Sequence, residues 1–394
     1  MIRVYDDAGN VIETHEHKGD FKATRPDSHH RIVEIIMRDT VSACAPGRVE
    51  LLGNHTDYNE GVVLGAAINR LITVSGVKND RSIRLSSADF GEVEIQPAEL
   101  RPLQEGRWAN YILGVADELR NLHVPIRGFT ADVSGDLPIG AGLSSSAACE
   151  LATALFLLKL FAARLAPLEI AKACQRAEHR YVGVQSGLLD QMISLYGRAD
   201  HAVFFDCRSE EIRCVPFPAE LALMIAESGR KREVAQTEYN LRREETHAAA
   251  RALGASALRD VSSAELDRRS DLSALLRRRS SHVTGENERV WRALKLLEAG
   301  DGIGFGKLMN ESHESSRQNF ENSTPELDLL VSIAQDLPGV LGARLTGAGF
   351  GGSTVTLCER PRGQQIAAEL SKRYGDATGI TPRVFVAQIA DGAK

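Results

Sequence analysis

The stretch at residues 138–150, PIGAGLSSSAACE, constrains the fold of this chain more than any other. Its glycines allow a tight turn and a close approach of the backbone to a ligand. Its three consecutive serines bring hydroxyl and N–H groups to one point. An apolar helical pattern at residues 147–165 follows at once, so free N–H groups and the positive end of a helix dipole point back at the loop. These features predict an anion site of the kind that holds a nucleotide phosphate. For this stretch alone, a Gly-Ser turn capping a buried helix is the alternative.

The composition predicts a globular protein of two domains. The chain has 394 residues, of which 43% are hydrophobic and 25% charged, as is usual for soluble proteins of this size. The formal net charge of −6 argues against broad binding to nucleic acid or to anionic membranes. We therefore expect neither nucleic acid nor a membrane as a partner. We also expect a monomer or weak homodimer.

The cysteines and the hydrophobic segments predict a cytoplasmic protein. The six cysteines are scattered without a CxxC pair, which disfavours a disulfide framework or a zinc site and fits a reducing compartment. The N-terminus is too polar for a signal peptide. The most apolar helix, at residues 151–166, contains Lys159 and Arg164 and is too short to span a bilayer.

The N-terminal residues differ in character from the rest of the chain. Residues 1–17 alternate apolar and polar side chains around Asp-Ala-Gly-Asn, which predicts a β-hairpin, and residues 18–30 have the composition of a linker. We expect an extension over residues 1–40, an N-terminal domain over 41–210 and a C-terminal domain over 211–394.

The remaining sequence alternates strand and helix patterns without an internal repeat. Strands are expected at residues 71–76, 83–87, 93–95, 129–133, 201–205, 211–215, 221–227 and 383–389. Helices are expected at residues 107–119, 167–181, 237–252, 286–297, 303–316 and 327–336.

A polar loop between two strand-like segments forms a second candidate site. The segment 43–61 reads ACAPGRVELLGNHTDYNEG and gathers Arg48, Asn54, His55 and Asp57 within ten residues. Such a density of hydrogen-bonding groups beside buried strands suits a polyhydroxylated ligand. A polar turn between strands is the alternative.

Three further residues, on two predicted helices, are candidates for chemistry or binding. The segment VQSGLLDQ predicts a helix with Asp190 in its first turn, where the dipole keeps a carboxylate ionised. Alternatively, Asp190 is a favourable N-terminal charge and nothing more. Trp108 and Tyr111 lie on the helix predicted at residues 107–119, and the sequence alone favours core packing for both.

Two other patterns are interpreted as structural. Gly347-x-Gly349-x-x-Gly352 has the spacing of a dinucleotide-binding loop, but a strand pattern follows it instead of a helix, so we expect a Gly-rich turn between two strands. The basic run RRRSS at residues 277–281 lacks accompanying aromatic residues and is interpreted as a solvated helical face.

Three segments together resemble the signature motifs of the GHMP small-molecule kinases. They are GRVELLGNHTDYNEG at residues 47–61, PIGAGLSSSAA at 138–148 and ARLTGAGFGGSTV at 343–355. The first is similar to the galactokinase branch of that family, and shorter matches cover about residues 43–390. The resemblance implies an α+β architecture, with an α/β N-terminal domain, an α+β C-terminal domain and the active site in the cleft between them.

The resemblance also implies a role for each site residue in an ATP-dependent sugar 1-kinase. Asp190 would be the catalytic base for the anomeric hydroxyl, and Arg48 would neutralise charge beside it. Ser146 and Glu178 would bind Mg²⁺. The residues implied to bind the nucleotide are Gly140, Ala141, Gly142, Leu143, Ser144, Ser145, Ser146 and Trp108. The residues implied to bind the sugar are Asn54, His55, Asp57, Gly187 and Tyr239. Independently, phosphoryl transfer needs positioning and charge neutralisation, which a backbone cradle, a carboxylate base and an arginine supply.

Asn54 departs from the galactokinase pattern, in which glutamate usually stands at this position. The position resembles the one that contacts the 6-hydroxyl of the sugar, and asparagine keeps hydrogen-bonding ability without the negative charge. We expect D-galactose as the substrate, with galacturonate or arabinose as alternatives. A non-catalytic sugar sensor and a kinase for a non-sugar alcohol are further alternatives. The intact Ser146, Glu178 and Asp190 disfavour the sensor, and the GNHTDYN loop disfavours the non-sugar alcohol.

Overall fold

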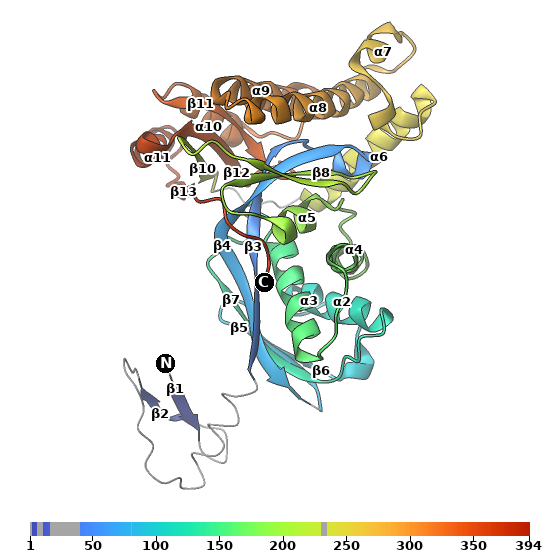
Figure 1. Ribbon diagram of the computed structural model, residues 1–394, viewed down its shortest axis with the longest axis vertical. Helices are drawn as coiled ribbons and strands as arrows, with labels where there is room; N and C mark the ends of the chain where they lie inside the picture. Colours follow the sequence, from blue (N-terminus) through green and yellow to red (C-terminus); the bar gives the residue numbers. More distant parts are fainter. Residues whose placement is uncertain (1, 6–10, 16–39, 80, 230–234) are drawn as a thin grey trace.

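The computed structural model describes residues 2–5, 11–15, 40–79, 81–229 and 235–394, and it contains two packed domains (Figure 1). Near the N-terminus, β1 (Ile2–Tyr5) pairs with β2 (Val11–His15) in antiparallel fashion, which confirms the predicted hairpin. The expected turn and the expected linker lie outside the described residues. None of the helices in the described ranges is both long and apolar enough to cross a membrane.

The N-terminal domain is built on a seven-stranded sheet. Six of its strands follow the order β6-β5-β7-β4-β8-β9, and the seventh, β3, pairs with β4. All neighbours are antiparallel except β5 and β7. The strands are β3 (Val41–Leu52), β4 (Val62–Lys78), β5 (Ile83–Ser87), β6 (Gly91–Ile95), β7 (Phe129–Gly135), β8 (His201–Asp206) and β9 (Ile212–Pro216). The long β3–β4 hairpin runs the length of the domain and carries the polar loop at its tip.

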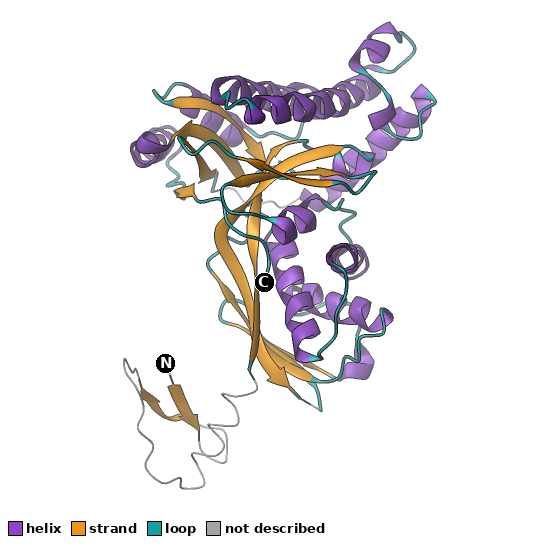
Figure 2. Ribbon diagram, viewed as in Figure 1, coloured by secondary structure: helices purple, strands orange, loops and turns teal. Residues whose placement is uncertain are grey.

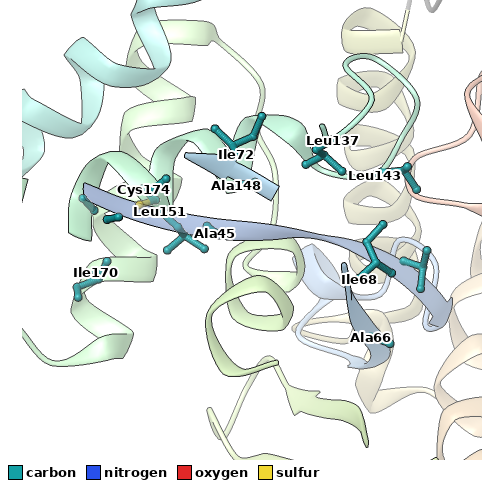
Figure 3. Close-up of a cluster of buried hydrophobic side chains, with 14 of the residues drawn as sticks. Ala45, Ala66, Ile68, Ile72, Leu137, Leu143, Ala148, Leu151, Ile170 and Cys174 are labelled. Atoms are coloured by element: carbon teal, nitrogen blue, oxygen red, sulfur yellow. The ribbon is translucent and has the colours of Figure 1, made fainter. Parts of the chain in front are cut away.

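Helices cover one side of this sheet, as Figure 2 shows. They are α2 (Asn110–Asn121), α3 (Ser145–Leu160), α4 (Pro167–Ala177) and α5 (Leu189–Tyr196). The helix α3 is apolar on all sides because it packs against β3 and β4 as well as against α2, α4 and α5. Most buried side chains of this layer, including Ala45, Leu151 and Cys174, belong to one large apolar core (Figure 3).

The C-terminal domain contains an antiparallel four-stranded sheet with the order β11-β12-β10-β13. Its strands are β10 (Leu221–Glu227), β11 (Val340–Thr346), β12 (Ser353–Glu359) and β13 (Val384–Ala387). Its helices are α6 (Ala235–Leu253), α7 (Ser263–Arg268), α8 (Ala274–Glu298), α9 (Gly302–Ser315), α10 (Pro325–Gln335) and α11 (Gly363–Thr378). The helices α10 and α11 bury a second apolar core against the sheet, while α9 packs on β11 and α8.

The domain boundary expected between residues 210 and 211 falls inside a β-hairpin of the N-terminal sheet. The strand β9 pairs with β8 in the N-terminal sheet, so that boundary would divide a hairpin. We propose a boundary between Pro216 and Leu221, because the C-terminal sheet begins with β10. Beyond β13 the chain returns to the first domain, where Lys394 and Cys44 exchange two backbone hydrogen bonds of 2.8 Å.

The interpretation of residues 277–281 as a solvated face is wrong for Arg279. This side chain is almost completely buried. Its guanidinium pairs with Glu245 at 2.6 Å and Glu321 at 2.7 Å, so α8 is tied to α6 and to the segment after α9. The charges on these partners, far away in sequence, make the burial of an arginine tolerable.

Candidate active site

The cradle, which we define as residues 140–146, is a tight loop that leads into α3. Gly140 and Gly142 have left-handed φ angles of 76° and 82°, which glycine adopts without steric penalty. Ser144, with φ of 58°, precedes the helix, and its hydroxyl is buried with no hydrogen-bond partner among the described residues. The first turn of α3 contributes further free N–H groups. The loop therefore has the donors that an anion needs.

A cavity of about 390 Å³ lies against this loop, and we call it the cradle cavity. Besides Gly140, Gly142 and Ser144–Ser146, it is lined by Trp108, which stacks on Phe90 with ring centroids 6.1 Å apart and planes inclined by 23°. Trp108 also packs against the core, so the predicted core role is only part of its environment. Its buried Nε1 has no partner among the described residues.

Two residues of the cradle do not point at the cavity. The side chains of Ala141 and Leu143 are buried in the hydrophobic core, and Figure 3 shows Leu143 among the core side chains. Their backbone carbonyls are also engaged, because Ala141 O accepts from Ser353 and Leu143 O accepts from the Arg48 N–H. Their side chains therefore anchor the loop, and only the backbone N–H groups of these two residues remain for the nucleotide contact that was expected of them.

A second cavity of about 330 Å³, which we call the inner cavity, adjoins the cradle cavity. The residues that line both cavities are Arg48, Tyr111, Ser146, Asp190 and Ala348. The inner cavity is otherwise bounded by the tip of the β3–β4 hairpin, the segment before α5 and α6. A ligand in each cavity would meet its neighbour at these shared residues.

An arginine–aspartate pair lies at the junction. Arg48 Nε donates to Asp190 Oδ1 at 2.8 Å, and Nη2 is 2.6 Å from the same oxygen. Arg48 Nη1 donates to the carbonyl of Gly142 at 2.8 Å. Asp190 lies in the first turn of α5, as predicted, and its side chain is 29% exposed. The arginine thus fixes a carboxylate beside the cradle while leaving part of it open to both cavities.

Local backbone geometry explains how Arg48 reaches this position. The register of β3 against β4 shifts between Pro46 and Arg48 and again between Glu50 and Leu52. Such bulges redirect side chains and are common beside active sites. Gly347, in the turn between β11 and β12, lies so close to the cradle that an added Cβ would be 2.8 Å from Gly142 O. The Gly-rich turn predicted between these strands therefore closes the junction from the C-terminal domain.

Three of the five predicted sugar-binding residues, Asp57, Gly187 and Tyr239, lie together on the wall of the inner cavity. An added Cβ at Gly187 would lie 2.1 Å from Asp57 Oδ2, so the segment before α5 packs directly on Asp57. Burial raises the pKa of Asp57 to about 7, with a further rise from the negative charges of Asp190 and Glu50. The third residue, Tyr239 on α6, stands with its ring 5.2 Å from the ring of His55.

Asn54 and His55 also border the inner cavity, but their polar atoms are already bonded within the protein. Asn54 Nδ2 donates to Glu50 and to the carbonyl of Gly347, both at 2.9 Å, while Oδ1 accepts from Asn322 Nδ2 at 2.9 Å. His55 Nε2 is 3.0 Å from Ala348 O, and Nδ1 is 2.8 Å from the Tyr58 hydroxyl.

This bonding leaves neither Asn54 nor His55 a free side-chain donor for the sugar contact that was expected of them. An amide with both N–H groups donated has no further donor. Burial lowers the pKa of His55 to about 3, so its ring is neutral at neutral pH and has one donor, which Ala348 takes. Both residues instead connect the hairpin tip to the C-terminal domain.

Glu178 and Ser146 provide oxygen donors near the junction. Both line the inner cavity, and the Glu178 carboxylate accepts a hydrogen bond from Ser186. Burial raises the pKa of Glu178, and the hydrogen bond from Ser186 opposes that rise. One carboxylate and one hydroxyl fit Mg²⁺, which typically takes one or two protein oxygens and completes its shell with phosphates and water. No cluster of three acidic, histidine or cysteine side chains suited to a metal occurs among the described residues.

The sequence interpretation missed Glu50 and underrated Tyr111. Glu50 lines the inner cavity, and Tyr111 lines both cavities. Glu50 lies between Arg48 and Asn54 in the polar segment, so its place on the same strand as Arg48, two residues away, was the available signal.

Models of known families match three parts of the chain. The GHMP kinases N terminal domain matches residues 110–198, and the GHMP kinases C terminal domain matches residues 293–376. The galactokinase galactose-binding signature matches residues 34–78, which include the β3–β4 hairpin.

Individual relatives match over most of their length. A galactokinase from Roseiflexus sp. (strain RS-1) is 43% identical, over 88% of this chain and 91% of its own. The galactokinase of Bos taurus is 42% identical, over 90% of this chain and 92% of its own. The crystal structure of Lactococcus lactis galactokinase complexed with galactose superposes with a TM-score of 0.88 at 32% identity, covering 93% of this chain and 98% of that one. The mevalonate kinase of Methanococcus jannaschii shares the fold, with a TM-score of 0.66 at 21% identity.

Proposed function

The chain belongs to the galactokinase branch of the GHMP kinases, and we propose that it transfers the γ-phosphoryl group of ATP to the anomeric hydroxyl of D-galactose. The observation that carries this proposal is the Arg48–Asp190 pair at the boundary of two adjoining cavities. ATP occupies the cradle cavity with its phosphates at Gly140, Gly142 and Ser144–Ser146. Galactose occupies the inner cavity beside Asp57, Gly187 and Tyr239.

Asp190 acts as the general base in this proposal. It takes the proton from the anomeric hydroxyl as that oxygen attacks the γ-phosphorus, a contribution of roughly 10²–10⁴-fold. The hydrogen bonds from Arg48 keep Asp190 oriented toward the junction. The positive charge of Arg48 also lies beside the transferring group, where negative charge must be balanced.

Mg²⁺ bound by Ser146 and Glu178 would neutralise charge on the phosphates of ATP. Independently of the metal, the cradle's N–H groups and serine hydroxyls orient the phosphate chain. The stack of Trp108 on Phe90 supplies an apolar wall for the purine base. This arrangement directs the γ-phosphate toward Asp190.

The charges in the inner cavity favour a neutral sugar over a uronic acid. Its lining contains four carboxyl groups, those of Glu50, Asp57, Glu178 and Asp190, and one cation, Arg48. The cation already pairs with Asp190. A sugar carboxylate would add a further negative charge without a free partner, which is costly in a buried site. Galactose is therefore favoured over galacturonate.

A coupled assay of ADP release tests the proposal. Purified protein is incubated with Mg-ATP and, separately, galactose, galacturonate, L-arabinose, glucose or N-acetylgalactosamine. We expect the highest kcat/KM with galactose. A higher kcat/KM with galacturonate or arabinose would make the chain a kinase for that sugar. If galactose binds by calorimetry but no sugar releases ADP, the chain is a sugar sensor on this fold.

We further propose that the protein works in the cytoplasm as a monomer or weak homodimer. The six cysteines are free in the structure, which suits a reducing compartment. Both cavities are formed by one chain, so the site needs no partner. Sedimentation across a concentration series tests the assembly, and an obligate higher oligomer would contradict it.

A further inference from the structure

Glu50 has a buried carboxylate, and only one of its two oxygens accepts hydrogen bonds from the described residues. Its side chain is 5% exposed. Oε1 accepts from Asn54 Nδ2 and from Arg344 Nη2, both at 2.9 Å. No hydrogen bond to Oε2 comes from any residue that the structure describes, and the residue lines the inner cavity. A carboxylate oxygen at the wall of a cavity can accept a strong, charge-assisted hydrogen bond from a ligand that donates to it.

The strand geometry places this carboxylate at a distance from the reacting atoms. Glu50 follows Arg48 by two positions on β3, which corresponds to roughly 7 Å along the strand. Arg48 holds Asp190 at the junction with the cradle cavity, whereas Glu50 is held by Arg344 from the C-terminal domain. A hexose with its anomeric hydroxyl at Asp190 therefore has the opposite side of its ring, with the substituents of C4 and C5, nearest to Glu50.

The surroundings of Glu50 fix the direction of the free oxygen. Arg344 is fully buried and also donates to the carbonyl of Leu51 at 2.9 Å. Thr346 Oγ1 accepts from the Glu50 N–H at 2.8 Å. With the backbone and Oε1 both held, the carboxylate has little freedom to turn its second oxygen away from the cavity.

We propose that Glu50 determines specificity for the sugar by accepting, through Oε2, a hydrogen bond from the hydroxyl at C4 or C6. This inference rests on the proposed function, because it places galactose in the inner cavity. It assigns to Glu50 the contact that was expected of Asn54, while Asn54 acts as a positioning residue that holds Oε1.

Deoxy sugars and the substitution Glu50→Gln test the contact. The amide oxygen is expected to take the place of Oε1, because two groups donate there, so an N–H group replaces the accepting oxygen at the cavity. In the wild type we expect 4-deoxygalactose or 6-deoxygalactose to lose roughly 10- to 100-fold in kcat/KM relative to galactose. In Glu50→Gln, this ratio should shrink by about tenfold through a rise in KM for galactose, with KM for ATP unchanged.

Glu286→Gln is the matched control. Glu286 is also a buried carboxylate that contacts Asn54, since its Oε2 accepts from the N–H groups of Gly53 and Asn54, but it does not line either cavity. Its substitution should lower stability and leave the galactose-to-deoxygalactose ratios unchanged. If Glu50→Gln does not fold, Glu50→Asp takes its place, because its shorter side chain moves the carboxylate away from the sugar by one methylene. The ratio of kcat/KM for galactose to kcat/KM for the deoxygalactoses should then fall as well.

The outcomes separate this inference from the proposed function. A wild type that releases no galactose-dependent ADP refutes the function. A wild type that phosphorylates galactose but penalises neither deoxy sugar refutes the role of Glu50 and leaves the function standing. The same holds if the penalty is unchanged in the Glu50 variant, or is lost equally in Glu286→Gln.

Discussion

The two cavities of the active site are constructed in different ways. The cradle cavity takes one wall from a short contiguous loop, residues 140–146, and the rest of its lining includes the aromatic side chains of Phe90 and Trp108. The inner cavity is lined by residues from β3, the hairpin tip, the segment before α5 and α6. One of its carboxylates, that of Glu50, is held in place by Arg344 from the C-terminal domain.

The cradle is therefore a local structure, whereas the inner cavity depends on contacts between segments that are far apart in the sequence. The cradle needs only glycines, serines and a helix start, all within one stretch of sequence. The inner cavity needs Glu50, Asn54 and His55 to be bonded to Arg344, Asn322 and Ala348, which lie more than two hundred residues away in the chain. Substitutions should therefore affect ATP and sugar kinetics separately, and the following experiments test that separation.

Asp190→Asn should have the largest effect, because Asp190 serves both cavities. Loss of the general base is expected to lower kcat by roughly 10²–10⁴-fold, while the affinities for ATP and galactose change little. Single-turnover kinetics and calorimetry on the same variant measure the two quantities. Near-normal turnover would remove Asp190 from the mechanism.

Glu178→Gln should act on the metal and leave sugar affinity largely intact. Groups that merely orient a metal ligand affect metal affinity by about 10- to 100-fold, and loss of a ligand should cost at least as much. We expect a shift of that size in the Mg²⁺ concentration needed for half-maximal activity. A Mg²⁺ titration that superposes on that of the wild type would contradict the assignment.

A pair of glycine substitutions compares the cavities directly. In Gly187→Ala the new methyl would collide with Asp57 Oδ2, and overpacking of about 1–2 kcal/mol should raise KM for galactose roughly tenfold. In Gly140→Ala the new methyl meets no atom within 4 Å, so only the left-handed backbone, of φ 76°, is strained. That variant should alter KM for ATP and leave KM for galactose unchanged. Equal effects on both substrates in either variant would contradict the separation.

Asp57 should give the inner cavity a pH dependence that is visible in stability. Burial raises its pKa from 3.8 to about 7, so the folded protein binds this proton more tightly than the unfolded chain does. The resulting stabilisation is complete below about pH 4 and is lost as the pH rises to about 7.

Asp57→Asn should flatten this part of the stability profile. Each pKa unit corresponds to about 1.4 kcal/mol, so we expect at least a change of that order in the pH-dependent component. Urea unfolding of both proteins between pH 4 and 8, without ligands, measures it. An identical slope in the two proteins would show that Asp57 is not the group responsible.

The parts of the fold that were predictable are those encoded locally. The N-terminal hairpin, the strand–turn–strand at β11 and β12, and Asp190 in the first turn of α5 were all anticipated. The helix α11 was not anticipated. The helix α8 was expected in two pieces, a helical face at residues 277–281 and a helix at 286–297, whereas the structure has one helix across both. Tertiary packing overrides weak local helix propensity.

The parts of the site that were not predictable depend on distant partners. The burial of Arg279 requires Glu245 and Glu321, and the pattern of the basic run gives no hint of either. Similarly, Asn54 looks like a sugar ligand until its hydrogen bonds to Glu50 and Asn322 are known. Residue types along one strand indicate that a polar site exists, but they do not reveal which polar atoms remain free for a ligand.

The central claim is that the sugar's anomeric oxygen lies at Asp190, where the two cavities meet. Carbon NMR of the reaction of [1-¹³C]galactose with Mg-ATP tests it most directly. We predict that the labelled carbon shifts and becomes split by coupling to phosphorus as ADP accumulates. A phosphorylated product whose labelled carbon shows no such splitting would place the phosphate elsewhere on the sugar and contradict the account.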